Sequence, residues 1–372
     1  MGSVAASSGA FCNRCRSPAV LEYMKTARSS RGPAARAAAS PLLALAVMAV
    51  LGSCAAPAAD QAVRSSSVTA RHGPLVSVRL GGEVDGLVAG GRYLWAYVRD
   101  TGVLVRVDQR TGRARRFRFA AWRGMPVTTA AGPDGLWLAN QHATRPDVIR
   151  IDPRTGRVVA RPGLPGAGPV TGMTAAYGSV WILVPSRTPG WRVLRLNPAT
   201  NRVDRISASI PGTQFNGSTA AIWASSGRIW VTGSMKVIVS LDPRTLALRD
   251  TATPTLSEGL VFAGGQAWHL NEAGPTLAVI NPLTDKLTRT LAVPPPSATG
   301  DDYVAAAPGL LWVFRGSRLA QLNPATGTII ASVRVDPIAP AFYSPALIAG
   351  RNLWYLAQTS HGTVLDQITP AQ

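Results

Sequence analysis

The chain has 372 residues, of which 46% are hydrophobic and 15% are charged, and its 38 Lys and Arg against 19 Asp and Glu give a formal net charge of +19. This balance excludes an intrinsically disordered chain and is typical of a globular protein with a large core. Because no cysteine follows Cys54, the rest of the chain has no disulfide framework.

Residues 1–53 predict an export signal. The apolar run 41–51 is too short to span a bilayer as a stable helix, and Lys25, Arg28, Arg31 and Arg36 precede it. Leu51-Gly52-Ser53-Cys54 resembles the bacterial lipobox, in which the cysteine is lipidated and becomes the first residue. A plain secretory signal is the alternative. Because Met24 is a more natural start, residues 1–23 are interpreted as a gene-model artefact.

The segment that follows predicts a lipid-anchored protein on the outer face of the cell membrane. Residues 54–73 are rich in Ala and Ser and are typical of a flexible tether that starts at Cys54. Residues 74–372 form the predicted folded domain. After Cys54 the chain keeps 32 bases and 18 acids, a net charge of +14.

Tryptophan recurs seven times in one context, each time after a small-residue turn. The positions are Trp95, Trp137, Trp181, Trp230, Trp268, Trp312 and Trp354. An acidic or amide residue, usually followed by Pro, comes at a similar distance after each Trp, as in Asp152-Pro153 and Asn197-Pro198. A period of roughly 40 residues predicts a repeat array with seven units.

Each unit is predicted to hold four short antiparallel strands. In the third unit, β-compatible runs at 170–176, 180–184, 193–196 and 202–206 are separated by Gly, Asn, Pro and Thr turns. The last unit has three such runs, and the first run of the domain, Leu75–Leu80, has no unit of its own. The pattern predicts an all-β, seven-bladed β-propeller closed by its N-terminal strand, which pairs into the last blade. We expect few helices.

The repeats resemble a known propeller family. Gly135-Leu136-Trp137-Leu138-Ala139 with Ile151-Asp152-Pro153-Arg154-Thr155-Gly156 is similar to the blades of streptogramin-lyase-like and YVTN-type propellers, and so is Leu311-Trp312-Val313 with Leu322-Asn323-Pro324-Ala325-Thr326-Gly327. The resemblance covers residues 75–369 and implies the fold. It implies little about function, because such propellers host enzymes, scaffolds and binding modules.

Candidate ligand contacts lie where inner strands begin, at the mouth of the axial channel. The residues ten positions before each Trp include Asp85, Thr171, Glu258, Asp302 and Ser344. Loops after the second strands add candidate contacts at His142, Trp191 and Glu272, and Trp191 has no counterpart in the other units. The alternative for the carboxylates is a set of solvated polar residues.

The resemblance also suggests a metal-assisted lyase, which uses Glu and His residues on the channel face. In this chain none of the seven residues three positions after Trp is Glu, and no Gly-x-Ser-x-Gly motif occurs. We therefore assign no catalytic residue, metal site or cofactor.

Three function classes remain. The leading interpretation is a binding or scaffold propeller at the cell envelope. The alternatives are a divalent-metal-assisted lyase or hydrolase at the channel mouth, and a sensor or assembly subunit of an envelope complex. The expected partners are the membrane, through the lipid anchor, and an anionic envelope polymer or an envelope protein. No basic run is interleaved with stacking aromatic residues, so nucleic acid is rejected as a partner. We expect a monomer.

Overall fold

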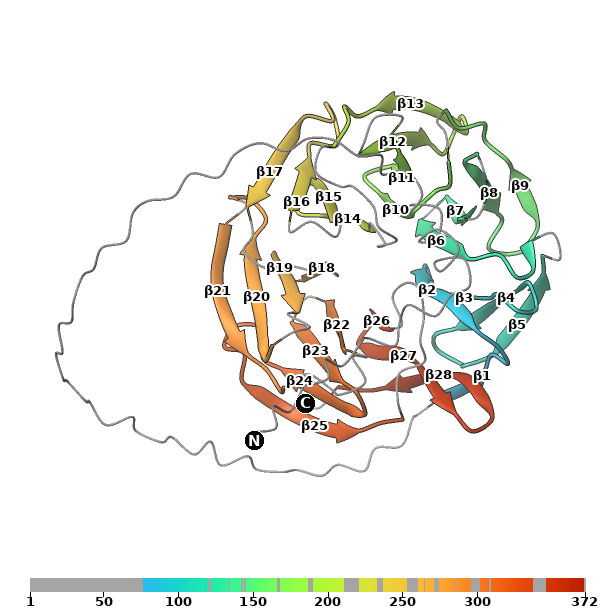
Figure 1. Ribbon diagram of the computed structural model, residues 1–372. Helices are drawn as coiled ribbons and strands as arrows, with labels where there is room; N and C mark the ends of the chain where they lie inside the picture. Colours follow the sequence, from blue (N-terminus) through green and yellow to red (C-terminus); the bar gives the residue numbers. More distant parts are fainter. Residues whose placement is uncertain are drawn as a thin grey trace, which may run out of the picture. The chain divides into compact units, whose positions relative to one another are not determined.

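The structure, a computed structural model, describes residues 76–370 except 120–121, 133, 142, 144, 166–167, 187–189, 211–220, 233–236, 253–259, 264, 271–273, 285, 296–301, 308 and 337–345. The described residues contain strands and no α-helix, and thus no helix that is long and apolar enough to cross a membrane. Seven four-stranded antiparallel sheets stand in a ring (Figure 1), which confirms the predicted seven-bladed β-propeller. Cys54, His142, Glu258, Glu272 and Ser344 lie outside the described residues.

Six blades are formed by consecutive strands. Blade 1 is β2 (Val84–Gly90), β3 (Tyr93–Val98), β4 (Val103–Asp108) and β5 (Ala114–Arg118); blade 2 is β6 (Val127–Gly132), β7 (Gly135–Asn140), β8 (Asp147–Ile151) and β9 (Val158–Ala160); blade 3 is β10 (Gly172–Ala176), β11 (Ser179–Pro185), β12 (Trp191–Asn197) and β13 (Arg202–Ile206). Blade 4 is β14 (Ala221–Ser225), β15 (Arg228–Thr232), β16 (Val237–Leu241) and β17 (Leu248–Ala252); blade 5 is β18 (Leu260–Ala263), β19 (Gln266–Leu270), β20 (Thr276–Asn281) and β21 (Lys286–Ala292); blade 6 is β22 (Asp302–Ala307), β23 (Leu310–Arg315), β24 (Arg318–Leu322) and β25 (Ile329–Arg334).

The seventh blade joins the two ends of the described chain. It contains β26 (Ala346–Ala349), β27 (Asn352–Thr359) and β28 (Gly362–Ile368), and its outer strand is β1 (Val76–Arg79). Strand β1 runs antiparallel to β28, with Val76 opposite Gln367, so the predicted closure by the N-terminal strand is confirmed. The described strands of the ring run from Val76 to Ile368.

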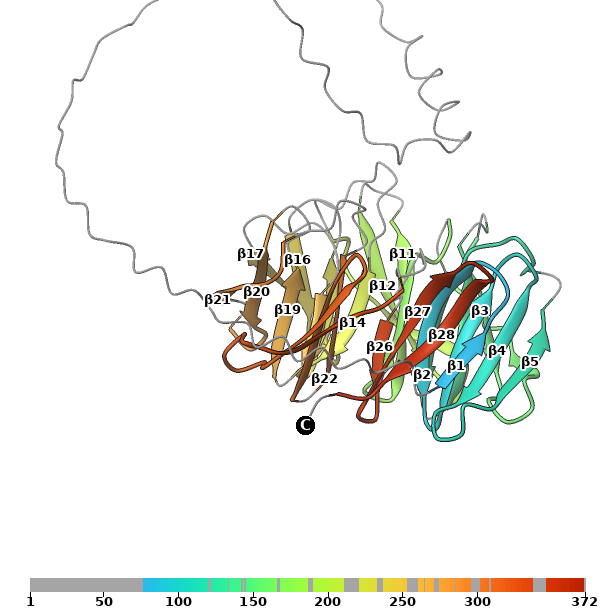
Figure 2. The ribbon, with the colours of Figure 1, turned by 90° about the horizontal axis from the view of Figure 1, so that it is seen from below.

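The meander gives the ring two distinct faces (Figure 2). Turns between the first and second strands of each blade, and between the third and fourth, share one face, which we call the turn face. Connections between the second and third strands, and from each blade to the next, lie on the opposite loop face. Inner strands begin at the loop face, so the channel-mouth candidates belong there, whereas β1 begins at the turn face and β28 ends there.

The turns between third and fourth strands have a common chemistry. In blade 1 the Oδ1 of Asp108 accepts the backbone N–H groups of Arg110 and Thr111, at 3.0 and 3.1 Å. Gly112 follows with a φ of 67°, a left-handed conformation that glycine adopts without strain. The Asp or Asn side chain thus fixes the turn by bonding to the backbone ahead of it, as the sequence predicts.

The seven Trp are wedges between adjacent blades. Each is at most 2% exposed and lies in a cluster with apolar residues of the next blade. Trp181 of blade 3, for example, packs with Ile222 and Val231 of blade 4. Trp354 of blade 7 packs with Leu87 and Leu94 of blade 1 and completes the circle. The clusters join blade to blade rather than fill one central core.

Candidate functional site

Asp85, at the start of β2, is buried rather than solvated at the channel mouth. Its side chain is fully buried and accepts the backbone N–H of Val127 at 2.9 Å. Val127 occupies the same repeat position in blade 2, so the carboxylate ties blade 1 to blade 2. Arg99 of the same blade completes the contact, with 3.1 Å between its Nε and Oδ1 of Asp85.

Burial decides the protonation of Asp85. Loss of solvent raises the pKa of Asp85 to about 7, while Arg99 and the N–H of Val127 act in the opposite direction. Glu83 also forms an ion pair with Arg99, so two carboxylates share one guanidinium. A buried carboxylate that is engaged in this way is a framework group of the blade.

Asp302 has the equivalent arrangement in blade 6. It lies directly opposite Arg315 in the sheet, and Nη1 of Arg315 is 2.6 Å from Oδ2 of Asp302. Both side chains are at most 2% exposed. Nη2 of Arg315 donates to the carbonyl oxygen of Gly274 in blade 5 at 2.9 Å, which links two blades. Each carboxylate is therefore held by an arginine of its own blade, and the alternative of solvated polar residues is wrong for Asp85 and Asp302. As ligand contacts the two residues stay predictions.

Thr171 also takes part in contacts between blades. Its hydroxyl and its N–H both donate to the carbonyl oxygen of Leu183, at 3.1 and 2.9 Å. Its own carbonyl oxygen accepts from the side-chain amide of Gln141 in blade 2, at 3.3 Å. Among the described residues, no group of three or more His, Cys, Asp or Glu is placed to hold a metal ion.

Trp191 does not lie in an exposed loop. It is the first residue of β12, pairs with Pro185 of β11, and is 2% exposed. Its ring packs with Trp181 and Ile210 in the cluster between blades 3 and 4. The sequence interpretation of an irregular loop position is wrong, because the Pro and Gly residues before Trp191 precede a regular strand. As a ligand contact Trp191 stays a prediction, and its burial argues against it.

Sequence reasoning missed a set of arginines that connect blades. In blades 1 to 3 an arginine of the third strand lies opposite the Trp of the second strand: Arg106, Arg150 and Arg195. Each donates to a carbonyl oxygen in the following blade's Asp-Pro or Asn-Pro turn, as in the 2.7 Å bond from Arg150 Nη1 to Pro198. The guanidinium of Arg150 also lies 5.5 Å from the ring of Trp137. Recurrence of Arg at one repeat position was the signal in the sequence.

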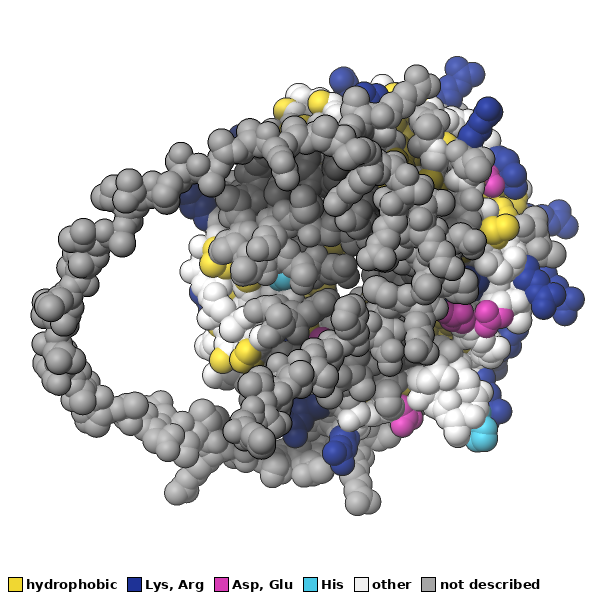
Figure 3. Space-filling view, in the orientation of Figure 1, with side chains coloured by type: hydrophobic (Ala, Val, Ile, Leu, Met, Phe, Trp, Pro, Cys, Tyr) yellow, Lys and Arg dark blue, Asp and Glu magenta, His cyan; other side chains and the backbone are white. Residues whose placement is uncertain are grey.

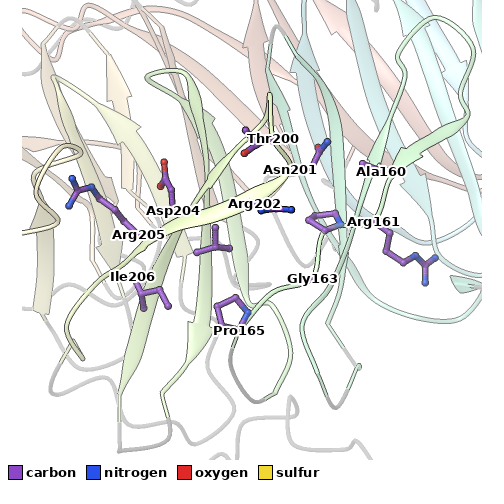
Figure 4. Close-up of a pocket in the computed structure, with 12 residues that line it drawn as sticks. Ala160, Arg161, Gly163, Pro165, Thr200, Asn201, Arg202, Asp204, Arg205 and Ile206 are labelled. Carbon is purple, nitrogen blue, oxygen red and sulfur yellow. The ribbon is translucent and has the colours of Figure 1, made fainter.

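A groove runs along the outer wall between blades 2 and 3 (Figure 4). It encloses about 680 Å³ between strand β13 with its preceding turn and the segment 160–165, which starts at the last residue of β9. Arg161, Arg202 and Arg205 line it, together with Asp204 and with apolar residues that include Val203 and Ile206. In Figure 4 the side chains of Arg161 and Arg205 point in opposite directions, away from the groove. The groove therefore suits several separated contacts along an extended partner better than one small anion.

Comparisons with known proteins identify the fold alone. No protein-family model matches the chain, and no curated protein matches it in sequence. Among solved structures, that of U3-55K is similar with a TM-score of 0.59 and 11% identity, covering 78% of this chain and 98% of that one. The Pan2 WD40 domain of Neurospora crassa is similar with a TM-score of 0.60 and 9% identity, covering 81% and 96%. At this identity the likeness shows that the chain has the β-propeller architecture of these proteins.

Proposed function

We propose that this protein is a lipid-anchored, extracytoplasmic binding or scaffold module of the cell envelope, with an anionic envelope polymer as its partner. The proposal includes membership of the streptogramin-lyase-like and YVTN-type propellers, which rests on the repeats, and acylation at Cys54, which rests on the lipobox. The propeller fold supports a binding role because its rigid wall and faces offer large surfaces. One observation about charge carries the choice of partner.

The positive charge of the propeller is concentrated in three blades. Residues 84–210, which hold blades 1 to 3, contain 19 Arg and 7 acids, a net charge of +12. Residues 211–372, which hold blades 4 to 6 and most of blade 7, contain 10 bases and 9 acids, a net charge of +1. Figure 3 shows Lys and Arg side chains gathered along the margin over β5, β9 and β13. A one-sided field of this kind attracts and orients an anionic partner.

The outer strand of blade 1 shows how dense this charge is. Between Asp108 and Asp134 the chain has no acid and six arginines, all exposed: Arg110, Arg113, Arg115, Arg116, Arg118 and Arg123. The groove beside β13 extends the positively charged outer surface across blades 2 and 3. We call this outer surface of blades 1 to 3 the basic wall. Because its arginines do not converge, recognition by many contacts along a polymer fits this wall better than capture of a small ligand.

Binding of a defined polyanion tests the partner. Residues 74–372 and the triple variant Arg161→Ser/Arg202→Ser/Arg205→Ser would be titrated with fluorescent polyglycerol phosphate over a range of salt concentrations. We expect at least a tenfold loss of affinity in the triple variant and a weaker dependence on salt, since three contacts are removed.

The matched control is Arg244→Ser/Arg318→Ser/Arg334→Ser, which loses the same charge from exposed positions in blades 4 and 6. It should bind the polymer within about twofold of the parent, because these blades lie outside the basic wall. Equal losses in both variants would contradict a polymer site on blades 1 to 3. Capture of an envelope protein by the parent, without binding of the polymer, would replace the polymer with that protein.

Acyl labelling tests the proposed lipid anchor and the membrane location of the protein. Cys54→Ser should abolish labelling and release the protein from the membrane fraction, because Cys54 supplies the thiol that is acylated. Absence of labelling in the unmutated chain would contradict the lipoprotein proposal.

A further inference from the structure

The turn face, most of whose turns belong to the described residues, presents exposed apolar side chains. Nine large hydrophobic side chains of the described residues are exposed. Seven of them lie in turns of the turn face or at the strand ends next to it: Val158, Val159, Tyr177, Leu283, Leu287, Ile329 and Ile330. Met125 and Ile206 lie at the loop face. Leu283, in the third turn of blade 5, is 67% exposed, the largest value of the nine. Single exposed apolar residues are ordinary, but seven of them on this face, together with the bases beside them, are the material of a contact surface.

The turn face also carries an excess of positive charge. Nine exposed bases stand in its turns or at their edges: Arg92, Arg110, Arg113, Arg154, Arg157, Arg202, Arg244, Lys286 and Arg351. The described carboxylates of the same turns are Asp108, Asp134, Asp152 and Asp242. Three of these four accept backbone N–H groups of their own turns, so their charge is partly compensated where it stands. Apolar side chains interspersed with arginines are the composition of a surface that settles at a lipid interface.

The chain enters the propeller at this same face. Val76, the first residue of β1, packs against Gly112 in the turn between β4 and β5, where a Cβ on the glycine would lie 2.5 Å from Cγ1 of Val76. The segment 55–75 joins Cys54 to Val76. If this segment is the flexible tether that its composition predicts, it spans roughly 25 Å on average, which is comparable with the radius of a domain of this size. An anchor at Cys54 would therefore hold the propeller within about one domain radius of the bilayer and would be joined to it through the face at which β1 begins.

From these three observations we infer that the turn face docks on the surface of an anionic bilayer and that the loop face points away from it. This inference rests on the proposed lipid anchor and adds the surface that the anchored protein presents to the lipid. The arginines of blades 1 and 2 contact headgroup phosphates, while side chains such as Val159, Leu283 and Ile330 enter the boundary with the acyl chains. The groove between blades 2 and 3 stays accessible from the side, except at Arg202, which stands at the edge of the turn face.

Binding to lipid vesicles tests the docking face without any anchor. Residues 74–372 lack Cys54, so their binding reports on the protein surface alone. The turn-face variant Arg110→Ser/Arg113→Ser/Arg154→Ser/Arg157→Ser is compared with Arg118→Ser/Arg192→Ser/Arg318→Ser/Arg334→Ser, which removes four exposed arginines from loop-face ends of strands. We expect the turn-face variant to bind vesicles of phosphatidylglycerol and phosphatidylcholine at least tenfold more weakly than the parent, since each base near an anionic surface adds to the attraction. The control should stay within about threefold.

Two outcomes would overturn the docking face: equal losses in both variants, or no binding of the parent to anionic vesicles. A second variant, Val159→Ser/Leu283→Ser, keeps all charges and should weaken vesicle binding severalfold without changing the melting temperature, because both side chains are exposed. Unchanged binding of this variant would contradict insertion of apolar side chains. Failure of acyl labelling at Cys54 together with intact vesicle binding would overturn the anchor alone, whereas labelling without vesicle binding would overturn the docking face alone.

Discussion

Blades 1 to 3 and blades 4 to 7 share one framework and differ in what lies opposite its tryptophans. In the first group the residue across from Trp on the third strand is Arg106, Arg150 or Arg195. In the second group it is Ser240, Val279, Gln321 or Gln367. The Trp wedge is therefore common to all seven blades, and the arginine is an addition to three of them.

This difference separates two uses of arginine. Arg150 is held between the ring of Trp137 and the carbonyl oxygen of Pro198, where it joins blades 2 and 3. Arg113, in the same half of the ring, is exposed at the edge of a turn and adds to the surface field. The basic half thus uses arginine both to connect blades and to present charge. The nearly neutral half is joined mainly by apolar packing, with single arginine contacts such as that of Arg289 with the carbonyl oxygen of Pro324.

Removal of the strand that closes the ring should have the largest effect on stability. Deleting Leu75–Leu80 removes β1, leaves β28 as an unpaired edge and opens the ring, so the free energy of unfolding should fall by more than for any single substitution below. Denaturant unfolding measures it. A truncated protein that melts within a degree or two of the parent would show that closure contributes little.

Truncation of a Trp in each half tests whether the framework is common. Trp181→Ala in blade 3 and Trp312→Ala in blade 6 should each lower the free energy of unfolding by about 3–5 kcal/mol, the usual cost of deleting a large core side chain. Trp191→Ala should cost a similar amount because its ring is buried. Chemical denaturation checks all three. If the loss at one of Trp181 and Trp312 is less than half of the loss at the other, the two halves depend on different frameworks.

The pH dependence of stability should differ between a buried and a turn carboxylate. Asp85 has a folded-state pKa of about 7 against an ordinary value of 3.8, so its contribution to stability is fully present below pH 3.8 and is lost as pH rises toward 7. The slope is at most about 1.4 kcal/mol per pH unit. Asp85→Asn keeps an acceptor for the N–H of Val127 and should remove this slope in unfolding measured from pH 4 to 8.

Asp242 in blade 4 is the control, because its pKa is shifted in the opposite direction. Backbone N–H groups of Thr245 and Arg244 lower the pKa of Asp242, so its contribution is present above the ordinary pKa and is lost as pH falls through the lowered value. Asp242→Asn should therefore leave the slope between pH 4 and 8 unchanged. If Asp85→Asn also leaves the pH dependence of stability unchanged, burial does not raise the pKa of Asp85 in the folded protein.

The two uses of arginine can be separated in blades 1 and 2. Arg150→Met should cost about 1–3 kcal/mol of stability, because hydrogen bonds from the guanidinium and its contact with a Trp ring are lost. Arg113→Met removes the same charge from an exposed turn edge and should cost under about 0.5 kcal/mol. Paired thermal melts provide the test. Equal effects would show that the arginine opposite Trp does not connect the blades.

The sequence predicted the fold in detail and the site only in part. The repeat period and the turn residues were enough to predict seven blades, because both depend on local chemistry that is repeated seven times. The β-compatible run 75–80, which belongs to no unit of its own, was enough to predict the closure. Burial of Asp85 and Asp302 was missed, since it depends on arginines at the far end of the second strand that reach back to the inner strand. Trp191 was missed because a Pro-Gly run before a strand looks like a loop when no partner strand is known.

Site-specific labels on the two faces test the orientation of the propeller most directly. Residues 74–372 contain no cysteine, so Val159→Cys on the turn face and Met125→Cys on the loop face each carry one environment-sensitive fluorophore. On addition of phosphatidylglycerol vesicles, we expect a blue shift and quenching by lipid-attached quenchers for the label at position 159, and no change for the label at position 125. A shift at position 125 without one at position 159 would contradict a turn face that lies on the membrane.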